Sequence, residues 1–252
     1  MPITMRKRAL VTGASGGIGA AIARAYARAG MRVAVHYNTS KPAAETVLGQ
    51  LEGDGHVLVQ GDLSDPIEVR SVVEGASEAM LGIDVLVNNA GVFEHTPFNT
   101  TSYDTWLSDW KRTLDINLMS AVNATYCVLP LMVRQGKGKV INIASRSAFR
   151  AETEAPAYAV SKAGMVSLTR CLARAEARHG ILSYCIAPGW VETAMAREGM
   201  EQMAADIISQ IPLGRIASVE DVASVALFLA SDGADYLTGI TIPVAGGSWL
   251  TT

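Results

Sequence analysis

The chain has 252 residues, of which 49% are hydrophobic and 18% are charged, and its formal net charge is −3. The hydrophobic share is ample for the core of one large α/β domain, and the charged share lies below the usual value of about a quarter. This slightly acidic balance argues against nucleic acid or an anionic membrane as a partner, because both attract basic surfaces.

The three cysteines have no close spacing, which favours a reducing compartment over a disulfide framework. No His/Cys spacing resembles a zinc site, so no metal is expected. The apolar run after the basic start is too short for a signal peptide. The longest apolar stretch, 118–133, includes three polar residues and a proline, which favours a buried helix over a membrane span. We therefore expect a cytoplasmic protein.

Short apolar runs alternate with helical patterns along the whole chain. We expect strands at 9–11, 33–35, 57–60, 85–87, 139–145, 181–187 and 241–244, and helices at 18–29, 42–51, from 64, about 103–133, 156–179 and 218–230. Strands that are apolar throughout are typical of a sheet covered on both faces. The pattern predicts one domain over 1–252, a doubly wound parallel sheet (Rossmann-like) with helices on both faces.

A glycine-rich turn, Thr12–Gly19, joins the first strand to the first helix. Its glycines permit a tight turn, a close approach by a pyrophosphate, and close helix–strand packing. The N-terminus of the following helix then offers free N–H groups to the phosphates. A dinucleotide cofactor is therefore expected here, on Gly13, Ser15, Gly17, Ile18 and Gly19.

Two other strand ends face the same predicted crevice. Asn89, Ala90 and Gly91 follow the fourth strand, where small residues would let a nucleotide lie against the backbone. Asp62 and Leu63 follow the third strand and are placed to meet an adenine edge. The alternative for Asp62 is a plain turn residue.

The end of the second strand indicates which cofactor is preferred. Sites that prefer NAD usually carry an acidic residue there, which binds the ribose 2′-hydroxyl. Residues 35–41 contain no carboxylate, whereas Asn38, Thr39, Ser40 and Lys41 could bind a 2′-phosphate. The segment also lacks arginine, so the positive signal is modest. The sequence favours NADPH over NADH.

Tyr158 and Lys162 are four residues apart, so they share one face of a helix. A phenol titrates near pH 10, and a fixed neighbouring cation lowers its pKa. The hydroxyl of Ser145, 13 residues earlier (158 − 145), could complete a site that grips and protonates a carbonyl oxygen. The alternative is a surface i,i+4 pair without function.

These motifs together resemble the short-chain dehydrogenase/reductase family, and within it the 3-oxoacyl-acyl-carrier-protein reductases. The resemblance covers nearly the whole chain. It implies that Tyr158 is the acid–base residue, that Lys162 lowers the pKa of Tyr158 and binds the nicotinamide ribose, and that Ser145 positions the substrate oxygen. It also implies that Asn117 holds a water link from Lys162 to solvent. The nicotinamide end would be held by Pro188, Gly189, Val191 and Thr193.

The sequence gives fewer signals for the residues that bind the substrate. A lid is expected at about 190–215, and His95, Arg146 and Trp190 are candidate substrate residues, with solvated loop charges as the alternative. Tyr184 stands where the family usually has asparagine, which predicts altered packing behind Pro188. An acidic carrier protein would need basic residues, and the candidates for such contacts are Lys137, Lys139 and His179.

We expect an NADPH-dependent carbonyl reductase with 3-oxoacyl thioesters as one substrate class. An NAD(P)-dependent alcohol or sugar dehydrogenase working in the oxidative direction is the first alternative. A non-catalytic NAD(P)-binding regulatory protein is the second. The resemblance also implies a homotetramer or homodimer, joined through the helices that include 118–133 and 165–177.

Overall fold

The computed structural model describes residues 6–99, 102–193 and 204–250. Seven parallel strands form one sheet in the order β3-β2-β1-β4-β5-β6-β7. The strands are β1 (Arg8–Val11), β2 (Arg32–Tyr37), β3 (Val57–Gln60), β4 (Val85–Asn88), β5 (Gly138–Ile143), β6 (Ile181–Pro188) and β7 (Thr241–Val244). The doubly wound parallel sheet predicted from the sequence is therefore confirmed.

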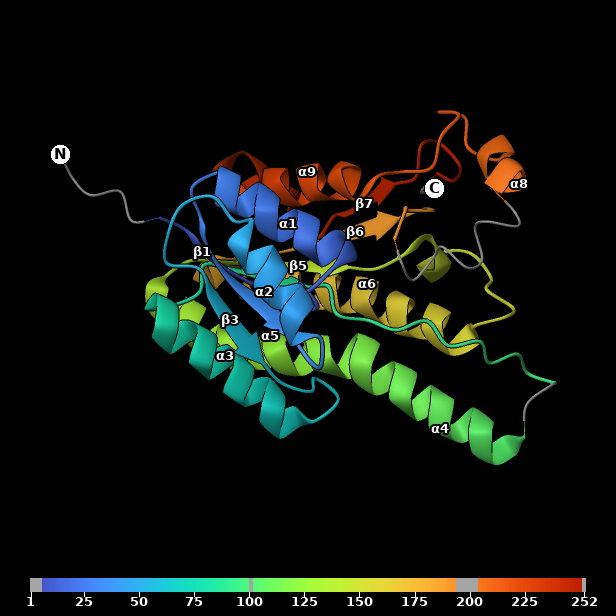
Figure 1. The fold of residues 1–252 in the computed structure, drawn as a ribbon, viewed down its shortest axis with the longest axis horizontal. Helices are drawn as coiled ribbons and strands as arrows, with labels where there is room; N and C mark the ends of the chain where they lie inside the picture. Colours follow the sequence, from blue (N-terminus) through green and yellow to red (C-terminus); the bar gives the residue numbers. More distant parts are fainter. Residues whose placement is uncertain (1–5, 100–101, 194–203, 251–252) are drawn as a thin grey trace.

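Helices cover both faces of the sheet (Figure 1). One face carries α1 (Gly17–Arg28), α2 (Lys41–Gly49) and α9 (Val219–Ala230), and the other carries α3 (Pro66–Met80), α4 (Tyr103–Leu114), α5 (Ser120–Gln135) and α6 (Pro156–Glu176). Each layer has its own apolar core against the sheet. The strand order reverses between β1 and β4, and a crevice at such a switch point is where ligands bind in open α/β sheets.

The long helix predicted at about 103–133 differs from the expectation in one respect. A π-helical turn, η1 (Asp115–Met119), separates α4 from α5, and Pro130 lies inside α5 without ending it. The helix stops only at Gly136, which adopts the left-handed conformation. Short π turns inside α-helices often mark functional sites, and this one contains Asn117.

The combined helix Tyr103–Gln135 has 33 residues and a mean hydropathy of 1.5 in its most apolar window, of which 39% is buried. By length and composition it is the one helix in the described part of the chain that could cross a membrane. A single helix of this kind is weak evidence, because core helices of globular proteins meet the same criteria.

Smaller boundary differences place residues of interest in turns. β5 ends at Ile143, so Ser145 lies beyond the strand and caps a short 3-10 turn, η2 (Arg146–Ala148). The predicted helix 156–179 ends as α6 at Glu176 and continues as a second 3-10 turn, η3 (Ala177–His179). Ser145 therefore projects from a turn at the carboxyl end of the sheet.

Tyr184 is fully buried, and its hydroxyl donates a hydrogen bond to the carbonyl of Ala234 at 3.1 Å. Lys139 lies 5.7 Å from the centre of the Tyr184 ring, and its Nζ binds Asp235 at 2.6 Å and the carbonyl of Ser231 at the end of α9. This tyrosine thus joins β6 to the short helix η4 (Asp232–Leu237). The packing that the sequence placed behind Pro188 lies instead at this joint.

Candidate active site

The glycine-rich turn has the backbone that a phosphate site needs. Gly13 has φ of +61°, and a methyl group at this residue would lie 2.9 Å from Cα of Ala90. A methyl group at Gly19 would lie 2.5 Å from Nδ2 of Asn89. No side chain caps α1, since its N-cap residue is Gly16. The first N–H groups of α1 therefore have no side-chain partner at the cap, which fits the binding of a phosphate group.

Buried polar contacts hold this turn against the neighbouring strand ends. The hydroxyl of Thr12 accepts hydrogen bonds from the N–H groups of Asn89 (2.9 Å) and Ala90 (3.0 Å). The Asn89 amide donates to the carbonyls of Thr12 and Gly13 at 2.9 and 3.1 Å. Nδ1 of His36, on β2, accepts from the Gly13 N–H at 3.0 Å. The ends of β1, β2 and β4 are thus locked together.

His36, on β2, bridges the ends of β1 and β3 with its neutral ring. Its Nδ1 accepts from Gly13, so its Nε2, 3.0 Å from the Gly61 carbonyl, carries the hydrogen. Burial lowers the pKa of His36, which favours this neutral form.

The end of β2 carries no carboxylate of its own, although Asn38 forms a hydrogen bond with the Asp62 carboxylate at the end of β3. Asn38, Thr39 and Ser40 are exposed, and Lys41 lies 3.8 Å from Glu45 on the next turn of α2. Ser15, on the glycine turn, is partly buried. These side chains retain the polar groups that a 2′-phosphate would use.

The end of β3 fits the turn alternative for Asp62. The Asp62 carboxylate accepts hydrogen bonds from the N–H (2.9 Å) and the hydroxyl (2.8 Å) of Ser64. These bonds hold the pKa of Asp62 below its usual value. Leu63 is buried in the core beneath α3, so its backbone is the part nearest the crevice.

The predicted catalytic residues converge at the carboxyl end of β5. Tyr158 lies in the first turn of α6, and its ring packs edge-on against Phe93 at a centroid distance of 5.1 Å. Nζ of Lys162 lies 5.6 Å from the centre of the Tyr158 ring and donates to the Ile143 carbonyl at 2.9 Å. Ser145 is close enough to Tyr158 to influence the pKa of the phenol.

Burial dominates the electrostatics of this pair. It raises the pKa of Tyr158, and Glu152 adds to the increase, while Ser145 and Arg146 oppose it. Burial also lowers the pKa of Lys162 to about 8. In this structure the pKa of Tyr158 is raised, and the groups that oppose the rise are Ser145 and Arg146, not Lys162 as the sequence predicted.

Asn117 is fully buried and fully hydrogen-bonded. Its Oδ1 accepts from the Val92 N–H at 2.7 Å, and its Nδ2 donates to the Val92 carbonyl at 2.9 Å and to Ser161 at 3.1 Å. A methyl group at Gly91 would lie 3.3 Å from Asn117 Oδ1 and 3.4 Å from Lys162 Nζ. Gly91 therefore lies close to both of these side chains.

The segment after β6 returns to the glycine turn. A methyl group at Gly17 would lie 3.6 Å from Cγ2 of Thr193, so the phosphate turn and Thr193 are neighbours. Val191 is buried and pairs in parallel with Ala217. A methyl group at Gly189, directly after Pro188, would lie 3.1 Å from Cα of Ala245. Of the residues expected at the nicotinamide end, Thr193 is therefore the one that lies beside the glycine turn.

The expected substrate residues differ in how far they are buried. Arg146 is partly buried, and its guanidinium lies 4.7 Å from the centre of the Trp190 ring, so it is not a freely solvated loop charge. His95 is exposed and pairs with Glu154 at 2.8 Å. This pair fastens the segment after β4 to the loop before α6.

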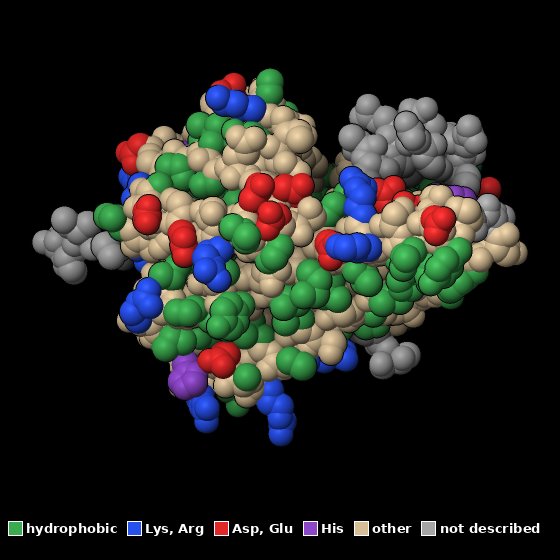
Figure 2. Space-filling model, turned by 90° about the horizontal axis from the view of Figure 1, so that it is seen from below, with side chains coloured by type: hydrophobic (Ala, Val, Ile, Leu, Met, Phe, Trp, Pro, Cys, Tyr) green, Lys and Arg blue, Asp and Glu red, His purple; other side chains and the backbone are tan. Residues whose placement is uncertain are grey.

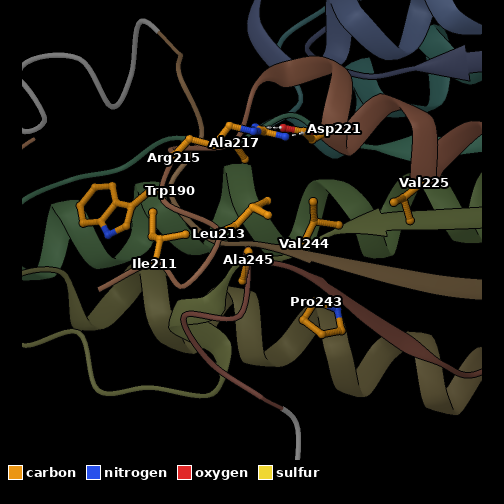
Figure 3. A pocket seen from close by; sticks show the side chains of 11 residues that line it. Trp190, Ile211, Leu213, Arg215, Ala217, Asp221, Val225, Pro243, Val244 and Ala245 are labelled. Atoms are coloured by element: carbon orange, nitrogen blue, oxygen red, sulfur yellow. Dashed lines mark hydrogen bonds and ion pairs between the residues drawn. The ribbon is translucent and has the colours of Figure 1, made fainter. Parts of the chain in front are cut away.

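A cavity of about 250 Å³ lies behind the first part of the expected lid (Figure 3). Trp190 contributes to it, and Arg215 and Asp221 form an ion pair at 2.6 Å on its wall. The cavity does not include Ser145 or Tyr158. The described part of the lid is Trp190–Thr193 and 204–215, including α8 (Ala204–Ser209), and 194–203 lies outside the described residues.

Several residues near the site could not be singled out from the sequence. Phe93 packs on Tyr158, Glu152 influences its pKa, and Trp249 stacks on Phe149 at 4.9 Å. Ser147 could have been noticed because it follows Ser145 by two residues in a predicted turn. Trp249 gave no signal, because its contact depends on a C-terminal segment that returns across the sheet.

Known proteins share this fold and much of this sequence. A protein-family profile described as enoyl-(acyl carrier protein) reductase matches residues 13–248. The chain is 35% identical to 3-oxoacyl-acyl-carrier-protein reductase of Staphylococcus aureus over 248 residues, covering 98% of this chain and 99% of the relative. The corresponding reductase of Salmonella typhimurium is 34% identical over 244 residues, with 97% and 98% covered.

Solved structures also resemble this chain along nearly its whole length. A Beutenbergia cavernae protein, proposed to be an NAD(P)-dependent gluconate 5-dehydrogenase and solved with bound NADP, superposes with a TM-score of 0.87 at 37% identity, covering 98% of this chain and 99% of that one. An Agrobacterium tumefaciens protein, proposed to be a gluconate dehydrogenase, gives 0.90 at 30% identity, with 96% and 95% covered. The chain belongs to the short-chain dehydrogenase/reductase family, whose members are NAD(P)-dependent oxidoreductases acting between CH–OH and C=O.

Proposed function

We propose that this protein reduces a carbonyl to an alcohol with NADPH, and that Tyr158 is the proton donor. The observation that carries the proposal is the meeting of Tyr158, Lys162 and Ser145 at the carboxyl end of β5, beside Gly91. The glycine turn after β1 lies beside Thr193, and these two segments are the proposed cofactor site.

Each residue has a defined task in this proposal. A bound nicotinamide supplies the hydride for reduction. The phenol of Tyr158 donates its proton to the carbonyl oxygen, and Ser145 holds that oxygen by a hydrogen bond. Lys162 adds positive charge beside the phenol as the proton leaves, and its second proposed task is to bind the nicotinamide ribose. Asn117 keeps the segment after β4 in place through its bonds to Val92.

NADPH is preferred in this proposal because the end of β2 offers exposed polar side chains and no carboxylate. The NADP in the Beutenbergia structure supports it. Initial rates with NADPH and NADH on one carbonyl substrate test the preference, and faster turnover with NADH at equal concentration would contradict it.

Two observations support the proposed substrate classes: the names of the related proteins and the cationic side chain of Arg146. 3-Oxoacyl thioesters are supported by the Staphylococcus and Salmonella reductases. Oxidation of a sugar acid such as gluconate is the second candidate, supported by two structural neighbours and by the cationic Arg146. A panel of acetoacetyl-CoA, 5-ketogluconate and a simple ketone, followed by NADPH absorbance, separates the two. Lack of turnover with all of them would argue against the proposed function.

The structure gives less support for recognition of an acidic carrier protein than the sequence did, because two of the three basic candidates are bound within the chain. Lys139 is buried and bound to Asp235, so its charge is not presented to a partner. His179 pairs with Glu176 at 2.8 Å. Lys137 is exposed. We therefore propose the thioester as a substrate without assigning a carrier surface.

We also propose a homotetramer in the cytoplasm. Large apolar side chains are exposed on α4 and α5, among them Tyr103, Leu107 and Tyr126. Figure 2 looks onto the layer that contains these helices and shows hydrophobic side chains interspersed with charged ones. Burial of such a face between subunits would remove it from water.

A further inference from the structure

Arg146 is a partly buried cation directly beside the proposed acid–base site. It follows Ser145 in the chain and begins the turn η2. It is close enough to Tyr158 for each of the two groups to influence the pKa of the other. Burial lowers the pKa of Arg146, so part of its hydration has been lost. A guanidinium is not deprotonated in proteins, and the positive charge therefore stays at this place.

Trp190 holds the guanidinium of Arg146 in position. The central carbon of the guanidinium lies 4.7 Å from the centre of the Trp190 ring, which is a cation–π contact. A guanidinium that stacks on an aromatic ring can still donate from its edge, because its five N–H groups lie in one plane. A long side chain that is already held in place loses less conformational entropy when it binds a ligand. Arg146 is therefore prepared to receive a group from outside the chain.

The charge of Arg146 is not neutralised within the described part of the chain. Glu152 raises the pKa of Arg146, but its carboxylate accepts a hydrogen bond from Ser147 at 3.2 Å and forms no ion pair with Arg146. Arg215, in contrast, forms an ion pair with Asp221 at 2.6 Å. A partly buried charge without a partner is costly, and a bound anion would offset that cost.

A carboxylate is the anion that fits this site best. The planar fork of a guanidinium binds the two oxygens of a carboxylate through two parallel hydrogen bonds. Arg150, which is exposed four residues after Arg146, adds positive charge nearby and contributes to the lowered pKa of Arg146. The field of two arginines attracts a negatively charged substrate toward Tyr158.

We infer that Arg146 binds a carboxylate of the substrate, and that the substrate is an oxo acid in its ionised form. This inference rests on the proposed carbonyl reduction at Tyr158 and names its substrate class. Of the two candidate classes it favours the sugar acid, because a thioester carries no charge at its acyl carbon. Arg146 holds the carboxylate while Ser145 and Tyr158 hold the carbonyl oxygen, and the two contacts together orient the carbonyl carbon toward the cofactor.

The binding of matched acids and esters tests this inference. Acetoacetate, 4-oxopentanoate and 5-oxohexanoate place the carboxylate at increasing distances from the carbonyl, and the methyl ester of each acid removes the charge with little change in shape. Each compound is titrated by calorimetry into the NADP⁺-saturated enzyme, which has no hydride to transfer. We expect at least one acid to bind about tenfold or more tightly than its ester, as is usual for a charge-assisted contact.

Substitutions then assign the preference to one side chain. Arg146→Gln should remove the preference for the acid and leave the affinity for the ester nearly unchanged. Arg146→Lys keeps the charge without the planar fork and should retain part of the preference. Arg150→Gln is the matched control, because Arg150 is an exposed arginine four residues after Arg146, and this variant should keep the preference.

Two results would overturn the inference. One is a wild-type enzyme that binds none of the acids more tightly than its ester, a result that needs no variant to fold. The other is a preference that survives in Arg146→Gln or is lost in Arg150→Gln alone. The calorimetry needs no turnover, so an acid preference without any ketone reduction would contradict the proposed function only. Ketone reduction without an acid preference would contradict this inference only.

Discussion

Lys162 shows how a functional residue can oppose folding. Its ammonium is buried, and one of its contacts is a hydrogen bond to the Ile143 carbonyl at 2.9 Å. Burial lowers the pKa of Lys162 to about 8, from 10.5. Between these two values the unfolded chain binds a proton that the folded chain does not. The free energy of unfolding contributed by this residue therefore rises as the pH rises from about 8 to 10.5.

Lys162→Met should consequently stabilise the protein near neutral pH. The difference of 10.5 − 8 = 2.5 pH units corresponds to about 3 kcal/mol below pH 8, less whatever the lost hydrogen bond contributed. Urea unfolding at pH 7 and at pH 10 measures it. The gain should shrink at the higher pH. A gain of the same size at both would mean that the charge of Lys162 is not its cause.

Tyr158→Phe tests the proton donor directly. Loss of a positioned acid–base group should lower kcat by about 10²- to 10⁴-fold, because the remaining site still binds cofactor and substrate. Cofactor binding, measured by fluorescence, should be retained. Tyr236→Phe is the control, since Tyr236 is fully exposed, and its kcat should be unchanged. Residual turnover of Tyr158→Phe equal to the wild type would remove Tyr158 from the mechanism.

At the residue scale, the sequence predicted the side chains that are neighbours within one helix, and it missed contacts between separate segments. Tyr158 and Lys162 share a helix face because helical spacing requires it. The Arg146–Trp190 contact joins the ends of β5 and β6 and is invisible in either segment alone. The same is true of Ser147 and Glu152, whose contact depends on how the turn η2 folds back.

At the scale of elements, the first βα unit illustrates why glycine positions matter. A methyl group added at Gly13 or Gly19 would lie less than 3 Å from backbone or amide atoms, whereas nothing lies within 4 Å of such a methyl at Gly75 in α3. A substitution at Gly13 or Gly19 must therefore move the cofactor turn. A substitution at Gly75 changes only the helix propensity of that residue.

Gly19→Ala should therefore abolish cofactor binding, measured by the quenching or transfer of fluorescence on titration with NADPH. Gly75→Ala should leave the affinity unchanged and stabilise the fold by about 0.5–1 kcal/mol, as expected for glycine replaced in a helix interior. Normal NADPH affinity in Gly19→Ala would contradict the close packing of the turn against Asn89.

The element pattern itself was largely readable from the sequence. Apolar runs predicted the strands, and β7 coincides with the predicted 241–244. The predicted end of the fifth strand was wrong, because Ala144 and Ser145 are as apolar or small as strand residues but lie beyond Ile143. The π turn could not be seen, since one extra residue leaves the apolar pattern of a helix almost intact.

At the scale of the whole molecule, the helical layer with α4 and α5 leaves large apolar side chains in water. Tyr126 is 73% exposed and Leu107 is 50% exposed. If these helices join subunits, Tyr126→Lys and Leu107→Lys together should yield a smaller species in light scattering. Ile67→Lys, on α3 and equally exposed, is the control and should leave the mass unchanged. An unaltered mass in the double variant would place the interface elsewhere.

The π turn has a consequence for how this chain can change in length. It holds one residue more than an α-helical turn, and each residue of an α-helix advances the face by about 100°. Deleting one residue between Asp115 and Met119 would restore a regular helix and keep its length nearly the same. Because the π turn absorbs its extra residue within one turn, α4 and α5 would keep their faces, while Asn117 would move relative to Val92 and Ser161. The position of Asn117 thus depends on the number of residues in this turn. A single-codon deletion beside Asn117 would displace it without replacing any side chain of the site.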